Sequence, residues 1–118
     1  MRARAWGALL VIAAIAGCGA ETSGGTDTSE PVTVRVHIAN GAVTPTNTST
    51  EARAGRPIVL LVDSDTTEEL HVHSAPEHTF RIEAAPNQRF EFTVTVPGRA
   101  DVELHHARRT VTTLLVRP

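Results

Sequence analysis

Sulfur and aromatic residues are scarce in this 118-residue chain, which has one cysteine, one methionine, one tryptophan, three phenylalanines and no tyrosine. Because Cys18 is the only cysteine, no disulfide can form within the chain, and the residues after it offer no thiolate or thioether to a metal. Every basic residue is an arginine, and the arginines form no long cluster. With so few rings for base stacking and no basic patch, the composition argues against nucleic-acid binding.

The N-terminal segment has the features of an export signal. Two arginines lie among the first four residues, and an apolar stretch follows at residues 6–16. That stretch is too short to cross ~30 Å of hydrocarbon as a helix, and it ends in small residues, as a signal peptide does. The string Ile15-Ala16-Gly17-Cys18 resembles the lipobox of bacterial lipoproteins, in which the cysteine receives a diacylglyceryl group and the chain is cut just before it.

We therefore predict a lipoprotein signal peptide at residues 1–17 and a lipidated Cys18 with acyl chains such as palmitate, which would hold the chain on the extracytoplasmic face of the cell membrane. An ordinary signal peptide with an incidental cysteine and a transmembrane helix are the two alternatives. Removing residues 1–17 leaves 101 residues (118 − 17), which is enough for one small domain. Nine of the eleven arginines then face thirteen acidic residues, a net charge of −4.

Residues 19–30 consist almost entirely of glycine, serine, threonine and acidic residues. Such a composition cannot bury a core, so residues 18–30 are predicted to be a lipidated cysteine followed by a disordered tether. The folded domain is then expected at residues 31–118.

From Pro31 onward the sequence favours β-strands. Apolar and polar residues alternate with a period of two, which is typical of half-buried strands, in the segments 32–38, 69–73, 79–84, 90–96 and 101–104. Continuous apolar or β-branched runs at 58–62 and 110–116 are consistent with buried strands. Seven or eight short strands without helical periodicity predict an all-β fold, an antiparallel β-sandwich. Its largest core candidates are Phe80, Phe90 and Phe92.

Histidines form the one chemical cluster of the sequence. In a strand, His71 and His73 would point to the same face about 6.5–7 Å apart, and Glu69 would share that face. Glu103 and His105 would share a face of their own strand in the same way. If the two strands are neighbours, the three histidines form a set of three nitrogens, which suits Cu(II) or Zn(II) more than Mg²⁺ or Ca²⁺. To share an ion, the imidazoles must approach within ~4 Å of each other.

Other residues near this set are further candidate ligands. They include Glu69 and Glu103 themselves, and His78, which follows His73 by five residues. His106 is also a candidate. In the alternation of inward and outward residues along its strand it has an inward position, so it either enters the core or lies past the end of the strand. The alternative is that these histidines only hydrogen-bond to backbone or are solvated.

A family resemblance rests on the strings Glu69-Leu70-His71-Val72-His73, Ala54-Gly55-Arg56-Pro57, Val102-Glu103-Leu104-His105 and Leu114-Leu115-Val116-Arg117. They resemble the cupredoxin-like domains of small bacterial lipoproteins, which are related to the EfeO-type cupredoxin domain of periplasmic iron-transport components. The resemblance covers about residues 32–117 and implies a Greek-key β-sandwich. The chain departs from the family after His73, where Ser74-Ala75-Pro76-Glu77 replaces the usual glycine and aromatic-acidic pair.

Blue-copper cupredoxins use two histidines, one cysteine and usually an axial methionine. The only cysteine and the only methionine of this chain precede the domain, so type 1 copper and the electron-carrier role that depends on it are excluded. The predicted function is the binding or handling of Cu(II) or Zn(II) by a membrane-anchored lipoprotein. No catalytic motif is present in the sequence, so no enzyme activity is expected. The alternative is a metal-free β-sandwich that binds a protein partner in the cell envelope.

Overall fold

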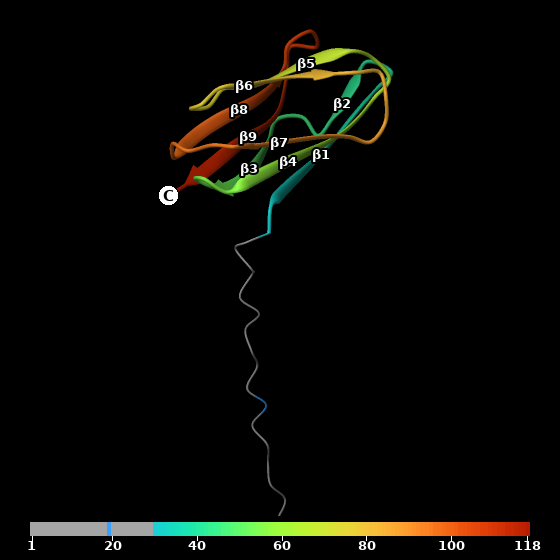
Figure 1. Cartoon of the computed structure of the whole chain (residues 1–118). Coiled ribbons are helices and arrows are strands. Elements are labelled where there is room, and N and C mark those ends of the chain that lie inside the picture. The colour runs from blue at the N-terminus through green and yellow to red at the C-terminus, as the bar shows by residue number, and fades with distance from the viewer. Residues whose placement is uncertain (1–18, 20–29) are drawn as a thin grey trace, which may run out of the picture.

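The computed structural model describes residue 19 and residues 30–118, and the strands of this domain are labelled in Figure 1. The predicted signal peptide, Cys18 and most of the predicted tether lie outside the described residues. The described strands are β1 (Val32–Ala39), β2 (Ala42–Thr44), β3 (Thr48–Arg53), β4 (Pro57–Ser64), β5 (Glu68–Val72), β6 (His78–Ile82), β7 (Gln88–Thr93), β8 (Gly98–Leu104) and β9 (Arg109–Arg117). In this part of the chain there is no helix long and apolar enough to cross a membrane.

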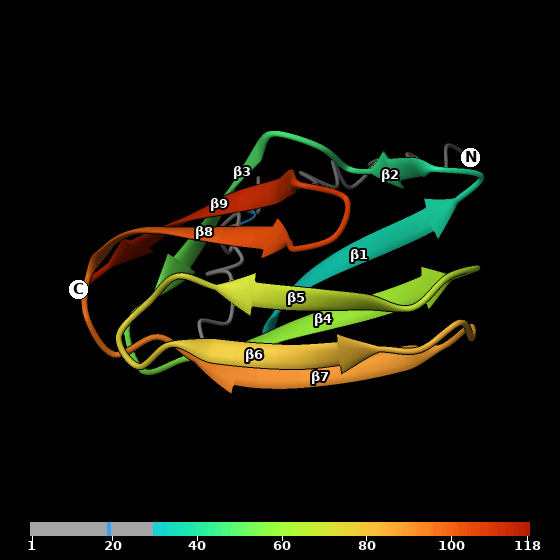
Figure 2. The ribbon, with the colours of Figure 1, turned by 90° about the horizontal axis from the view of Figure 1, so that it is seen from above.

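The strands form two sheets that pack face to face (Figure 2). One sheet has the order β2-β1-β4-β7 and the other has the order β3-β9-β8-β5-β6. The predicted all-β sandwich is confirmed, with nine strands instead of seven or eight. The pairing is mixed, whereas wholly antiparallel pairing was expected: β1 with β4 and β3 with β9 are parallel pairs. The reason is that β3 crosses to the opposite sheet, so β4 returns beside β1 in the same direction.

Two strands were not predicted, namely β2 and β3, which lie in a stretch rich in threonine, serine and asparagine. Both are edge strands, and only Ala52 of β3 is buried. The hairpin from β1 to β2 turns at Asn40 and Gly41, whose φ angles of 53° and 76° fit the tight two-residue turn that an Asn-Gly pair favours. An edge strand needs few apolar residues, so the hydrophobic period that reveals a strand is weak here.

The core lies between the two sheets and is built from alternate residues of the central strands. Its largest fully buried side chains are aliphatic: Ile58, Leu60, Leu70, Ile82, Leu104 and Leu114. Among the aromatic core candidates, Phe92 is buried, whereas Phe80 and Phe90 are partly buried and pack against the core with their ring centroids 5.2 Å apart. Because all nine strands and all of these core residues lie within residues 31–118, we expect this segment to fold on its own.

Candidate histidine site

The three predicted ligands, His71, His73 and His105, gather on the outer face of the five-stranded sheet. Strands β5 and β8 are antiparallel neighbours, with His71 opposite Glu103. One residue past the end of β8, the backbone N–H of His105 donates a hydrogen bond of 2.8 Å to the carbonyl of Glu69, which continues the pairing. The ring centroid of His71 lies 5.9 Å from that of His73 and 5.4 Å from that of His105.

Strand alternation explains why these side chains share a face. Leu70 and Val72 of β5 are fully buried and face the core, so the residues between and beside them face solvent. Val102 and Leu104 have the same role in β8. The result is an exposed surface that carries histidines and carboxylates from both strands.

Carboxylates engage the ring nitrogens of two of these histidines. Nε2 of His71 lies 2.5 Å from Oε1 of Glu69, and because an ionised carboxylate can only accept, this nitrogen carries the proton. Nδ1 of the same ring lies 3.8 Å from Glu77, and Nε2 of His73 lies 3.3 Å from Oε2 of Glu103. In this arrangement the potential metal donors of His71 and His73 already have carboxylate partners.

The electrostatics of Glu69 reflect the histidines around it. The hydrogen bond from His71 lowers the pKa of Glu69 below its ordinary value; burial opposes this shift, and the charges of His71, His105 and His106 add to it. Glu69 is therefore ionised at neutral pH and is available either as an oxygen ligand or as a hydrogen-bond acceptor for His71.

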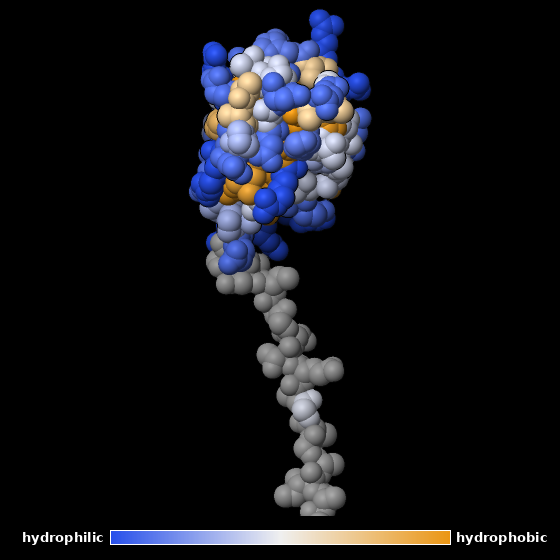
Figure 3. All heavy atoms as spheres, turned by 90° about the vertical axis from the view of Figure 1, so that its right-hand side faces the viewer, coloured by the Kyte–Doolittle hydropathy of each residue, from blue (hydrophilic) through white to orange (hydrophobic). Residues whose placement is uncertain are grey.

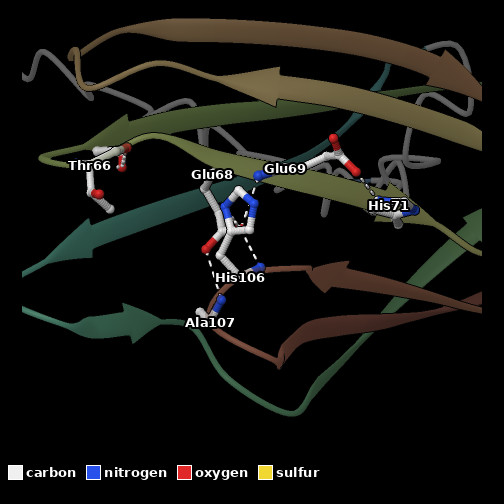
Figure 4. Close-up of polar contacts among 7 residues, drawn as sticks. Thr66, Glu68, Glu69, His71, His106 and Ala107 are labelled. Atoms are coloured by element: carbon white, nitrogen blue, oxygen red, sulfur yellow. Dashed lines mark hydrogen bonds and ion pairs between the residues drawn. The ribbon is translucent and has the colours of Figure 1, made fainter.

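Sequence reasoning missed Glu68, which is 4% exposed. Figure 4 shows Glu68 directed toward His106 and Ala107, whereas Glu69 is directed toward His71. His106 is exposed and lies past the end of β8, one of the two placements that its parity allowed, with Nδ1 3.2 Å from Oε1 of Glu68. The sequence did contain a signal for Glu68, which lies two residues before the core residue Leu70 and therefore points to the same side of the strand. A carboxylate on a core-facing position must find hydrogen-bond donors.

The structure separates His78 from the three gathered histidines. His78 is paired with Val72, a core-facing residue, and its ring stacks on Phe80 and lies against Phe92. Its Nε2 is 2.8 Å from the carbonyl oxygen of Thr93, across the edge between the sheets. His78 thus joins β6 to the last residue of β7 and does not share the exposed face.

The histidine face is open and is not a preformed metal site. Within residues 19 and 30–118, no group of three or more His, Cys, Asp or Glu side chains is arranged to hold a metal ion. Grooves of about 490 and 540 Å³ lie elsewhere on the domain, and neither is lined by His71, His73 or His105. An open face of this kind suits an ion or a partner surface better than an enclosed small molecule.

Comparison with family models and with curated proteins gives no match. Solved structures are similar in fold: a reduced Cu(I) form of an amicyanin variant has a TM-score of 0.51 and 14% identity, over 72% of this chain and 82% of that chain. An oxidized amicyanin variant has a TM-score of 0.52 and 13% identity, over 71% and 81% of the two chains. A purple cupredoxin from Nitrosopumilus maritimus has a TM-score of 0.51 and 14% identity, over 73% and 99%. At such identities the likeness establishes the fold alone, and the domain is a cupredoxin-like β-sandwich.

Proposed function

We propose that this chain is a membrane-anchored, extracytoplasmic lipoprotein whose domain binds or handles Cu(II) or Zn(II) through His71, His73 and His105. The observation that carries the proposal is the gathering of three imidazoles on one solvent-exposed face, with ring centroids 5.4 and 5.9 Å apart. Imidazole nitrogen is a ligand that both metals favour. The similarity in fold to an amicyanin variant in its Cu(I) form supports a copper-binding role.

The donors of this domain do not fit a type 1 copper centre. Such a centre needs a cysteine thiolate beside two histidines, and residues 30–118 contain neither cysteine nor methionine. Nitrogen and oxygen are the donors that the histidine face offers. We therefore propose metal binding or handling without blue-copper electron transfer and without catalysis.

To bind a metal, the histidines would exchange their carboxylate partners for the ion. The nitrogens that share an ion lie within ~4 Å of each other, since each bond is ~2.0–2.1 Å long. His71 and His73 are neighbouring side chains on the sheet surface, about a quarter and a half exposed, and we propose that rotation of their side chains brings the nitrogens together without movement of the strands. Glu69 and Glu103, once displaced, stay close enough to serve as oxygen ligands or to orient the rings.

A metal-free interaction module is the second candidate function. The observation in its favour is that Glu69 and Glu103 already engage the nitrogens of His71 and His73, so two of the three imidazoles have carboxylate partners without an ion. A partner protein would then recognise the face through hydrogen bonds. Figure 3 shows one side of the domain, on which hydrophilic residues cover most of the surface and small hydrophobic patches lie between them.

Calorimetric titration of residues 31–118 with Cu(II) and with Zn(II) separates the two functions. We expect micromolar or tighter binding of at least one metal, and its loss in the double variant His71→Ala/His73→Ala. Because only the neutral imidazole binds a metal, affinity should weaken when the pH is lowered far enough to protonate the imidazoles.

The matched control is His37→Ala, since His37 is exposed on β1 in the other sheet. This variant should bind the metal as the unmodified domain does. Absence of heat with both metals, or heat that the double variant leaves unchanged, would contradict metal binding at this face and favour the interaction module.

A further inference from the structure

Glu68 is the one ionisable side chain that is buried within the described residues, where the other buried polar residues are serine and threonine. It precedes Leu70 and Val72 on the core-facing side of β5, and those two residues are fully buried. A buried carboxylate is costly unless hydrogen bonds satisfy it. Its partners therefore show what this position does for the fold.

Three backbone N–H groups donate to the carboxylate of Glu68. Oε1 accepts from Glu69 at 2.9 Å and from His106 at 2.7 Å, and Oε2 accepts from Ala107 at 2.9 Å (Figure 4). Hydrogen bonds to an ionised acceptor are stronger than those between neutral groups. Two of the three donors lie 38 and 39 residues along the chain, so the carboxylate joins β5 to the turn between β8 and β9.

The same turn carries His105, whose backbone N–H donates to the carbonyl of Glu69 at 2.8 Å. Three consecutive N–H groups, those of residues 105, 106 and 107, are thus bound by two consecutive residues of β5. This attachment places the ring of His105 5.4 Å from that of His71. The third histidine of the face consequently depends on the turn, whereas His71 belongs to a central strand.

We propose that Glu68 is the positioning residue of the histidine face. Its carboxylate fixes the turn at residues 105–107 against β5 and so holds His105 beside His71. Both of its oxygens are occupied by backbone N–H groups, so Glu68 acts through the turn and is not itself a ligand. The effect of Glu68 on metal affinity rests on the proposed function, whereas its effect on the turn does not.

The test uses residues 31–118 with Glu68→Gln, which keeps the shape of the side chain but turns one acceptor oxygen into an NH₂ group. Amide hydrogen exchange of His106 and Ala107 should become about 10–100-fold faster, the range for losing a bond to a charged acceptor. The nuclear Overhauser contacts between the rings of His71 and His105 should weaken. Cu(II) affinity, measured by calorimetry, should fall by about 10–100-fold, as for other residues that orient a ligand.

The control is Glu91→Gln, which changes an exposed carboxylate of β7 in the other sheet and should leave all three readouts unchanged. Unchanged exchange and unchanged ring contacts in Glu68→Gln would overturn the proposal, and so would unchanged affinity in a domain that binds Cu(II). If the unmodified domain binds no metal, only the proposed metal-binding function is contradicted. Amide hydrogen exchange and the contacts between the two histidine rings still test the positioning role of Glu68. If Glu68→Gln does not fold, exchange in the unmodified domain decides. Amides of residues 106 and 107 that exchange as fast as those of an unstructured peptide would refute the attachment.

Discussion

Two adjacent leucines of β4 show where the stability of the sandwich should come from. Leu60 faces the core and is fully buried, whereas Leu61 faces the other side of the sheet and is partly exposed between Arg35 and Arg89. The variants Leu60→Ala and Leu61→Ala remove the same atoms from the same strand. The difference between their free energies of unfolding therefore measures burial, with the change in strand propensity cancelled.

Leu60→Ala should lower the free energy of unfolding by about 2–5 kcal/mol, because it loses the transfer free energy of the side chain and leaves a cavity. Leu61→Ala should cost about 1 kcal/mol, because a partly exposed side chain loses less on truncation and leaves no enclosed cavity. For a domain of this size each kcal/mol corresponds to about 4–8 °C in Tm. We thus expect Leu60→Ala to lower Tm by at least about 8 °C, and Leu61→Ala by about 4–8 °C.

Far-UV circular dichroism is the suitable assay, because residues 31–118 contain no tryptophan and no tyrosine for intrinsic fluorescence. Urea unfolding of both variants gives the free energies, provided that the slopes of the transitions agree with that of the unmodified domain. Equal destabilisation by Leu60→Ala and Leu61→Ala would refute the reasoning, since the outer face of β4 would then contribute as much as the core.

The remaining predictions concern a surface ion pair and the membrane anchor. The hydrogen bonds from Arg117 lower the pKa of Glu51, so this exposed pair favours the fold above the ordinary pKa of Glu51 and ceases to do so as the pH falls through the lowered value. In Arg117→Gln the pKa of Glu51 should return to its ordinary value in an NMR titration of the carboxyl carbon; a carboxyl that still titrates low would assign the shift to another cause. Cys18→Ala in the full chain should move the protein from the membrane fraction to the soluble fraction, and a variant that stays in the membrane would exclude a lipid anchor.

The fold was predictable from sequence wherever the determinants are local. The alternation in β1, β5 and β8 follows from one buried face, and both glycine-containing turns at Asn40-Gly41 and Gly55 have the positive φ angles that glycine tolerates. The predicted strand at 90–96 ends at Thr93 in the structure, because the backbone N–H of Thr95 bonds to Ala75 in a neighbouring loop. A contact of that kind is set by tertiary structure and leaves no periodic signal.

The candidate site was predictable in its parts but not in its assembly. Residue parity placed His71 and His73 on one face, and the condition that β5 and β8 be neighbours was met. Parity alone could not show that carboxylates would engage the ring nitrogens, since the partner of His73 comes from the adjacent strand. Glu68 escaped notice because two of its three donors are 38 and 39 residues away.

Fold and donor set carry separate information in this domain. The cupredoxin-like sandwich at 13–14% identity shows how the strands are arranged, and many folds host unrelated functions. The chemistry must follow from the side chains that the strands present, and these are histidines and carboxylates without sulfur. Because ligands on strands are held more precisely than ligands on turns, His71 should be fixed by the sheet, whereas His105 should depend on Glu68. Metal affinity would then respond to a change at Glu68 through His105 alone, so Glu68→Gln should have little further effect in a domain that already carries His105→Ala.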